Sequence, residues 1–162
     1  MKSWSSHYKF SVLLLLGVFA AAASSADEEI WRTNPHHLSI VILGSDDRDA
    51  TAFTLGADYE YRVNEILGLG FVVEHAFEDI DATTLLATAD IHVWQGLAFQ
   101  TGPGVEFVDG EDDEGREEEF TYRIGALYEF EFGRFTISPQ IHYDFTTGAD
   151  SLVFGGAVGF AF

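Results

Sequence analysis

This chain of 162 residues has no cysteine and very little lysine. With no cysteine, a disulfide framework is excluded, and the fold must rest on backbone pairing and burial. Lysine occurs only at Lys2 and Lys9, so residues 27–162 carry six arginines against 27 acidic residues, a formal net charge of −21. Such a chain is not expected to bind nucleic acid through a basic patch. Its expected electrostatic partners are cations, although acidity also serves plain solubility.

Long hydrophobic runs are missing as well. The apolar run from Val12 to Ala23 has about a dozen residues, fewer than the roughly 20 that a spanning helix needs. Lysines precede it, and the small residues Ser24 to Ala26 follow it, which predicts a secretory signal peptide over residues 1–26, cleaved after Ala26. A retained anchor is the alternative. Residues 27–162 then form one domain, and no later run is long enough for a helical membrane protein.

Strand patterns dominate what is present. Apolar and polar residues alternate with a period of two, with turn residues between the segments, and no segment keeps helical spacing. In the last segment, Asp150 to Phe162, one face is apolar, the other carries small residues, and the sequence ends on an aromatic ring. The segments are 37–43, 53–63, 67–77, 84–94, 97–107, 120–132, 135–145 and 150–162. An even number of strands of about ten residues is typical of a small transmembrane barrel.

Two prolines lie inside these segments, Pro103 and Pro139. Each removes a donor from the hydrogen-bond ladder, and a closed barrel has no free edge to hide that loss. Bulges beside Gly102 and Gly104, and near Ser138, are therefore expected.

The connections alternate in length. Longer acidic or polar loops are expected at 44–50, 78–82, 109–119 and 146–150, and turns of three residues or fewer at 64–66, 95–96 and 133–134. Outer-membrane barrels have long extracellular loops and short periplasmic turns. Both chain termini are therefore predicted to be periplasmic.

The charged face of the strands must point away from hydrocarbon, because each charge there costs a few kcal/mol. The positions expected to line the lumen as a polar network are Asp58, Glu60, Arg62, Glu74, Asp90, His92, Glu106, Arg123, Glu129, Glu131, Gln140, His142 and Asp144. The aromatic residues of the opposite face sort toward the two rims, as in the girdles of membrane barrels. A soluble ligand-binding β-sandwich is the alternative, and it would need the apolar face covered.

In these patterns, and in the stretches 59–62, 102–106 and 159–162, the chain resembles the small eight-stranded outer-membrane proteins of the OmpA and OmpW type. The resemblance spans the whole of residues 27–162 and rests on pattern. It implies an all-β fold, an eight-stranded antiparallel transmembrane β-barrel with up-and-down topology, in the outer membrane of a Gram-negative bacterium. We also expect a monomer without cofactors, in contact with outer-membrane lipid and lipopolysaccharide.

An eight-stranded barrel is just wide enough inside for side chains to fill it, so a wide pore is not expected. Two interpretations of the lumen stay open. Arginines can bridge the carboxylates in a closed plug, because buried charges must be paired. Alternatively, the acidic excess lines a narrow, cation-preferring water path. The expected role is therefore structural, surface-interacting or that of a narrow channel.

Some barrels of this size are lipid A acylases or deacylases, so a lipid A-modifying enzyme is the alternative function. Ser138, His142 and Asp144 share a face, but residues four apart on a strand are roughly 13 Å apart, too far for a nucleophile and its base. His75 points outward near the outer rim, where such a base is needed, but no serine lies two residues away. No enzymatic activity is predicted.

Divalent cations are possible partners of the acidic outer loops. The loop Asp109 to Glu119 could hold calcium through clustered carboxylates. Its spacing departs from the EF-hand pattern, because Gly115 takes the seventh place and Phe120 the last ligand place. A solvated acidic loop is the other interpretation. His36 and His37 are not expected to share a metal ion, since adjacent strand residues face opposite ways.

Overall fold

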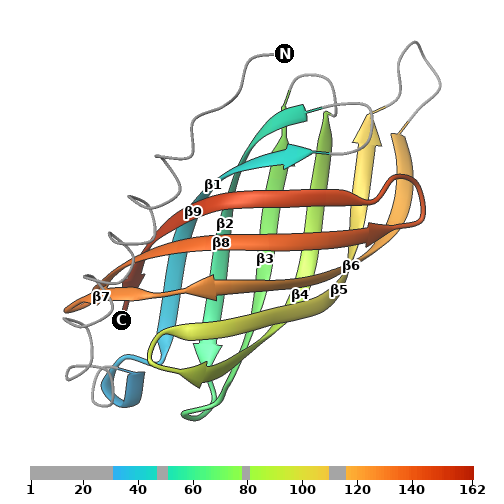
Figure 1. Ribbon diagram of the computed structural model, residues 1–162. Coiled ribbons are helices and arrows are strands. Elements are labelled where there is room, and N and C mark those ends of the chain that lie inside the picture. The colour runs from blue at the N-terminus through green and yellow to red at the C-terminus, as the bar shows by residue number, and fades with distance from the viewer. Residues whose placement is uncertain (1–30, 47–50, 78–80, 110–115) are drawn as a thin grey trace, which may run out of the picture.

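The structure is a computed structural model, and it describes residues 31–46, 51–77, 81–109 and 116–162. These residues form a single antiparallel sheet that closes on itself (Figure 1). Its strands are β1 (His36–Asp46), β2 (Thr51–Arg62), β3 (Leu67–Ala76), β4 (Ala82–Trp94), β5 (Leu97–Asp109), β6 (Arg116–Tyr128), β7 (Phe130–Phe132), β8 (Phe135–Thr146) and β9 (Ser151–Ala161). Because β6 and β7 both pair with β8 and are separated by Glu129 alone, they act as one interrupted strand of the barrel wall. The barrel therefore counts as eight-stranded.

Neighbours along the chain are neighbours in the sheet, and the ring closes between the first and last strands. His36 and Phe162 exchange two backbone hydrogen bonds, of 3.2 and 2.8 Å, at this closure. The short turns at residues 63–66, 95–96 and 133–134 lie at one end of the barrel with the C-terminus, which we call the short-turn end. The strand ends Asp46, Thr51, Ala76, Ala82, Asp109 and Arg116 and the connection 147–150 lie at the other, the long-loop end.

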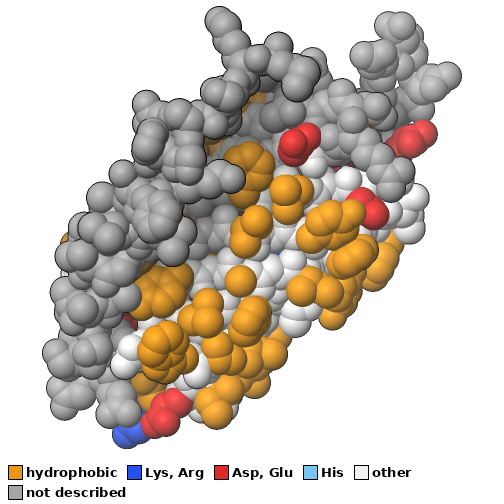
Figure 2. Space-filling model, viewed as in Figure 1, with side chains coloured by type: hydrophobic (Ala, Val, Ile, Leu, Met, Phe, Trp, Pro, Cys, Tyr) orange, Lys and Arg blue, Asp and Glu red, His pale blue; other side chains and the backbone are white. Residues whose placement is uncertain are grey.

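The alternation of the sequence becomes an inside and an outside. Along β8, the side chains of Thr136, Ser138, Gln140, His142 and Asp144 are buried, whereas those between them are exposed. The exposed positions are aliphatic or aromatic in strand after strand, and apolar side chains cover the wall seen in Figure 2. The barrel is therefore polar inside and apolar outside, the reverse of a soluble barrel. None of the described residues belongs to a helix long and apolar enough to span a membrane.

Aromatic rings gather on the outer surface near both ends. Phe53 and Phe77 stack at 6.0 Å near the long-loop end, and at the short-turn end the rings of His36 and Phe162 stack at 5.4 Å. Rings at these heights fit the two interfacial girdles of a membrane barrel.

The expectation of proline bulges is wrong. Pro103 pairs with Tyr122 and Pro139 with Gly156 in unshifted registers. Both proline rings are exposed on the outer face, and the β4–β5 ladder omits pairs at residues 87 and 88, opposite Gly102 and Pro103, without changing register. Likewise, the pairs of residues 128 and 129 with Pro139 and Ser138 are missing from the ladders on β8. Each missing donor is thus accommodated by the omission of two pairs, and no extra residue is inserted.

Candidate functional site in the barrel lumen

The interior holds the polar residues, and the structure places each of the thirteen sequence-predicted positions there. Eight are buried, namely Glu60, Glu74, Asp90, Arg123, Glu129, Gln140, His142 and Asp144. Five are half-buried, namely Asp58, Arg62, His92, Glu106 and Glu131. They come from every strand between β2 and β8, so the barrel wall brings together residues that are far apart in the sequence.

The first group is the Arg123 cluster, formed by Arg123 on β6, Glu74 on β3 and Asp144 on β8. Arg123 is only 1% exposed, and its guanidinium donates to both oxygens of each carboxylate at 2.7–2.8 Å. Glu74 lies on a strand that does not neighbour β6, so this pair crosses the lumen. Two bidentate pairs of this kind are strong and directional. They connect β3, β6 and β8 across the lumen and block it at this level.

The second group, the His37 cluster, lies toward the short-turn end and contains His37, Glu60, Arg62, His92 and Glu129. Glu60 lies 2.8 Å from His92 Nε2 and 3.0 Å from Arg62 Nε. Glu129 lies 3.4 Å from Arg62 Nη2, 3.8 Å from His37 Nδ1 and 3.8 Å from His92 Nδ1. Two carboxylates therefore share one arginine and two imidazoles.

Asp58, Asp90 and His142 lie between the two clusters, since each is two residues along its strand from a cluster member. Gln100 donates from Nε2 to Asp58 Oδ2 at 3.0 Å. Among the described residues, neither carboxylate oxygen of Asp90 has a hydrogen-bond partner, and Asp90 is 2% exposed. An unpaired carboxylate in such a place is costly.

Inward glycines make room for these side chains. A methyl group added at Gly68 would collide with the carboxylate of Glu60, and one at Gly125 would collide with Nδ1 of His142. The narrow interior therefore holds large polar groups only because the facing strands carry no side chain at these points.

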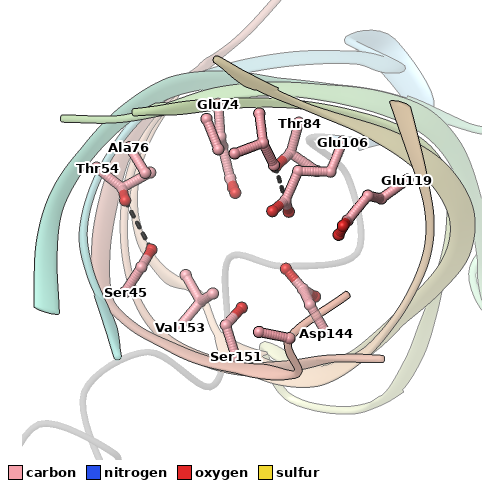
Figure 3. A pocket seen from close by; sticks show the side chains of 13 residues that line it. Ser45, Thr54, Glu74, Ala76, Thr84, Glu106, Glu119, Asp144, Ser151 and Val153 are labelled. Carbon is pink, nitrogen blue, oxygen red and sulfur yellow. Dashed lines mark hydrogen bonds between the residues drawn. The ribbon is translucent and has the colours of Figure 1, made fainter. Parts of the chain in front are cut away.

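A cavity of about 260 Å³ opens above the Arg123 cluster at the long-loop end. Figure 3 shows Glu74, Glu106, Glu119 and Asp144 pointing toward its centre. Thr84 donates to Glu106 at 3.1 Å. A second cavity of about 280 Å³ lies at the short-turn end and shares no lining residue with the first. The Arg123 cluster separates the two cavities.

The candidate catalytic residues are not brought together in the lumen. Ser138 and His142 lie on β8 with Gln140 between them on the same face, which leaves them roughly 13 Å apart. His142 Nδ1 has no hydrogen-bond partner among the described residues.

On the outer surface, the structure adds two partners to His75 that sequence reasoning missed. Its Nδ1 lies 3.0 Å from Thr83 Oγ1, and its Nε2 lies 3.6 Å from Asp81 Oδ1. Thr83 is its cross-strand partner on β4. The sequence pattern alone could not provide this register, because residues 78–82 were expected to form a loop.

Sequence reasoning also left His37 out of the lumen set. The signal was present, because Ser39 and Val41 lie on the inner face and the period-two pattern extends back to residue 37. His36 and His37 do face opposite ways: His36 packs outside against Phe162, and His37 contacts Glu129 inside. The proposed calcium loop cannot be described in the same way, since its residues 110–115 lie outside the described part of the chain.

Neither a protein-family model nor the sequence of a curated protein matches this chain. Among solved structures, the N-terminal β-barrel domain of Pseudomonas aeruginosa OprF matches with a TM-score of 0.66 at 14% identity, over 80% of this chain and 98% of that chain. Ail, the attachment invasion locus protein of Yersinia pestis, matches with a TM-score of 0.52 at 16% identity, over 80% of this chain and 99% of that chain. Ail in complex with the heparin analogue sucrose octasulfate gives 0.54 at 16%, over 78% and 97%. At these identities the likeness establishes the fold alone: the predicted eight-stranded antiparallel up-and-down β-barrel is confirmed, and it is the fold of these outer-membrane proteins.

Proposed function

We propose that this chain is an integral outer-membrane protein of a Gram-negative bacterium whose role is structural or surface-interacting, without an open pore. The observation that carries the proposal is the Arg123 cluster, which ties β3, β6 and β8 together across the lumen inside an apolar outer wall. Buried ion pairs across the lumen make the barrel rigid and block a path for solutes. This suits a barrel that supports surface loops better than it suits a channel.

The experiment is a planar-bilayer recording on purified, refolded protein. The expected result is the absence of stepwise currents, because the Arg123 cluster lies across the lumen between the two end cavities and the space beyond it admits no more than a single ion or water. A steady conductance from the wild-type protein would overturn the closed-lumen proposal. Cation preference in that current would support the narrow-channel alternative, which the four carboxylates around the long-loop cavity favour.

The proposal includes an orientation and a processing step. Residues 1–26 act as a cleaved signal peptide, both termini face the periplasm, and the long-loop end faces the medium in contact with lipopolysaccharide. Mass spectrometry of the membrane-extracted protein should give a chain that begins at Asp27. A tag placed after Phe162 should not be reached by an antibody on intact cells. Binding of the antibody on intact cells would contradict the proposed orientation. Cross-linking in membranes should give a monomer.

The surface partners of this chain should differ in charge from the ligand of Ail, whose solved complex holds a polyanion, a heparin analogue. The stretch 109–119 of this chain has eight acidic residues and one arginine. Its long-loop end should therefore repel polyanions and attract divalent cations or cationic partners. Heparin-column binding at low salt would contradict this expectation, and calorimetry with Ca²⁺ would test the loop for a cation site.

Lipid A modification stays the second candidate function because of one observation, the contacts of His75 with Thr83 and Asp81 on the outer surface. A hydroxyl next to an imidazole that has a carboxylate near its other ring nitrogen resembles the arrangement that activates a hydroxyl nucleophile. The test is mass spectrometry of lipid A from cells that express the wild type, His75→Phe or Thr83→Val. Identical lipid A in wild-type and His75→Phe cells would reject an enzymatic role for this group.

A further inference from the structure

We propose that the His37 cluster binds one divalent transition metal ion of the Zn²⁺ class, held by His37, Glu60 and Glu129 inside the lumen. This site is separate from the acidic loops, and it does not depend on the surface role proposed above. It rests on the positions of three donors, on the space between them, and on an unpaired carboxylate beside that space.

The three donors converge from three parts of the barrel. One ligand atom from each of His37, Glu60 and Glu129 lies within 4.8 Å of the other two. Zinc takes nitrogen and carboxylate oxygen at about 2.0–2.2 Å, which puts neighbouring donors roughly 3.4 Å apart. Side-chain shifts of about 1 Å would bring the three donors to that spacing, and a water would take the fourth place.

The imidazole of His37 is already oriented for this task. Its Nε2 lies 2.8 Å from Thr136 Oγ1, and its Nδ1 lies on the side of Glu129, at 3.8 Å. A hydrogen bond to the far ring nitrogen is the usual way in which proteins fix a metal-binding histidine, because it selects the tautomer with a free lone pair toward the metal. Here Nε2–H would donate to Thr136, and Nδ1 would be the ligand.

The space beside these donors fits one ion. A cavity of about 20 Å³ is lined by His37, Glu60 and Glu129, together with His92, Asp58 and Asp90. A water-sized sphere needs about 10–15 Å³, so this cavity admits a single ion or water and excludes an organic ligand.

Asp90 is the independent sign of a cation. It lines the same cavity and is 2% exposed, and neither of its carboxylate oxygens has a hydrogen-bond partner among the described residues. A carboxylate buried without a partner is unfavourable by several kcal/mol unless it takes up a proton or a positive charge accompanies it. A metal ion in the cavity would supply that charge to Asp90 and to the carboxylates of Glu60 and Glu129 together.

Arg62 is the competing cation, because it contacts both Glu60 and Glu129 at 3.0 and 3.4 Å. It also lines the 280 Å³ cavity at the short-turn end, which gives its side chain room to turn away from the carboxylates. His92 and Glu129 line that cavity too, so an ion that enters from the short-turn end meets the donors directly.

The donor chemistry selects the metal. Calcium and magnesium take all-oxygen sites, whereas imidazole together with carboxylates suits zinc and the neighbouring divalent transition ions. A second imidazole is close at hand, since His92 Nε2 lies 2.8 Å from Glu60. The site should therefore discriminate zinc from calcium.

The test is isothermal titration calorimetry of ZnCl₂ into the folded full-length protein in detergent micelles, after treatment with EDTA and dialysis. The expected result is one zinc ion per barrel. Loss of an outer-shell partner weakens metal binding about 10–100-fold, so His37→Gln, which removes a direct ligand, should weaken it by at least about 100-fold. Glu129→Gln, which keeps the size of the side chain, should also weaken zinc binding.

The matched control is His36→Gln. Its imidazole is on the outer face, stacked on Phe162 and hydrogen-bonded to the Tyr59 hydroxyl, so this variant should bind zinc as the wild type does. Circular dichroism of each variant verifies the β-sheet fold. Two results overturn the proposal: no one-to-one zinc binding by the folded wild type, or unchanged binding by folded His37→Gln, which would place the zinc on the loops. Calcium that binds with equal affinity at this site would overturn the metal assignment.

Discussion

Arg123 is the residue on which the interior depends most, because its guanidinium is fully buried and neutralises two buried carboxylates. Substitution by methionine leaves Glu74 and Asp144 together without a cation. Breaking a buried ion pair in this way costs about 3–5 kcal/mol. The expected outcome is a fall of that size in the free energy of unfolding, measured by denaturant titration of the protein in lipid vesicles.

Two comparisons separate pairing from packing. Arg62→Met removes a half-buried arginine that lines an end cavity together with Glu129, where water can solvate that carboxylate. The fall in the free energy of unfolding should therefore be clearly smaller than for Arg123→Met. The triple variant Arg123→Met, Glu74→Leu, Asp144→Leu leaves no charge unpaired and should recover most of the stability. Equal losses for the two arginine variants would contradict the special role of the Arg123 cluster.

Glycine at residue 159 is required by the side chains that face it. An added methyl group would collide with His37 Nε2 and lie 2.5 Å from Ser39 Oγ and from Thr136 Oγ1. Gly159→Ala should therefore lower the free energy of unfolding by about 1–3 kcal/mol, as overpacking does. On the same strand, a methyl group at Gly156 meets its nearest atom at an ordinary 3.5 Å, so Gly156→Ala should stay within about 0.5 kcal/mol of the wild type. Equal effects in the same vesicle titration would reject this account.

At the scale of elements, the wall strand of β6 and β7 shows why local patterns have limits. Alternation predicts one strand over 120–132, and the side chains do keep that alternation. The strand is nevertheless interrupted at Glu129. Leu97 and Tyr128 form the last pair between β5 and β6, and on the other side Pro139 of β8, which has no amide donor, stands opposite Tyr128 without pairing. Beyond it only β8 is a partner, and the Glu129 amide donates instead to Gly96 at 2.7 Å. A partner strand that turns away is invisible in the sequence of the strand that it leaves.

The turn beside this interruption can be tested. Gln95 and Gly96 both have positive φ, 33° and 84°, as a two-residue hairpin turn of type I′ requires. Gly96→Ala should cost about 1–3 kcal/mol, because a side chain is strained at this φ and would also collide with the Glu129 carbonyl. Gln95→Asn places a residue that tolerates positive φ and should be neutral or stabilising. A neutral Gly96→Ala in denaturant titration would contradict the turn assignment.

For the whole molecule, strand number, parity and the polar interior could be predicted, because each depends on a period of two that is written into consecutive residues. The pairings across the lumen could not. Arg123 meets Glu74 from 49 positions away, and their approach depends on how the sheet tilts and closes. The same holds for His37, Glu60 and Glu129, which alternation places inside but does not place together. The prediction of bulges beside the prolines was wrong for a different reason. The sequence does not tell whether a ladder next to a proline inserts an extra residue or omits pairs.

The apolar outer wall leads to a prediction that separates a membrane barrel from a soluble one. Ile40, in the middle of β1, is 60% exposed, and Ile66, in the turn at the short-turn end, is 61% exposed. In water, an arginine at either position would be equally harmless, because the two exposures match. In a bilayer, an arginine near the midplane costs about 2–4 kcal/mol, and one near the interface about 0–1 kcal/mol.

Folding titrations into lipid vesicles should therefore show a loss of about 2–4 kcal/mol for Ile40→Arg and almost none for Ile66→Arg. Ile40→Ala measures how much of the loss comes from packing alone, and it should account for the smaller part. If the two arginine variants were equally stable in vesicles, the apolar wall would not be facing hydrocarbon, and the membrane assignment would fall with it.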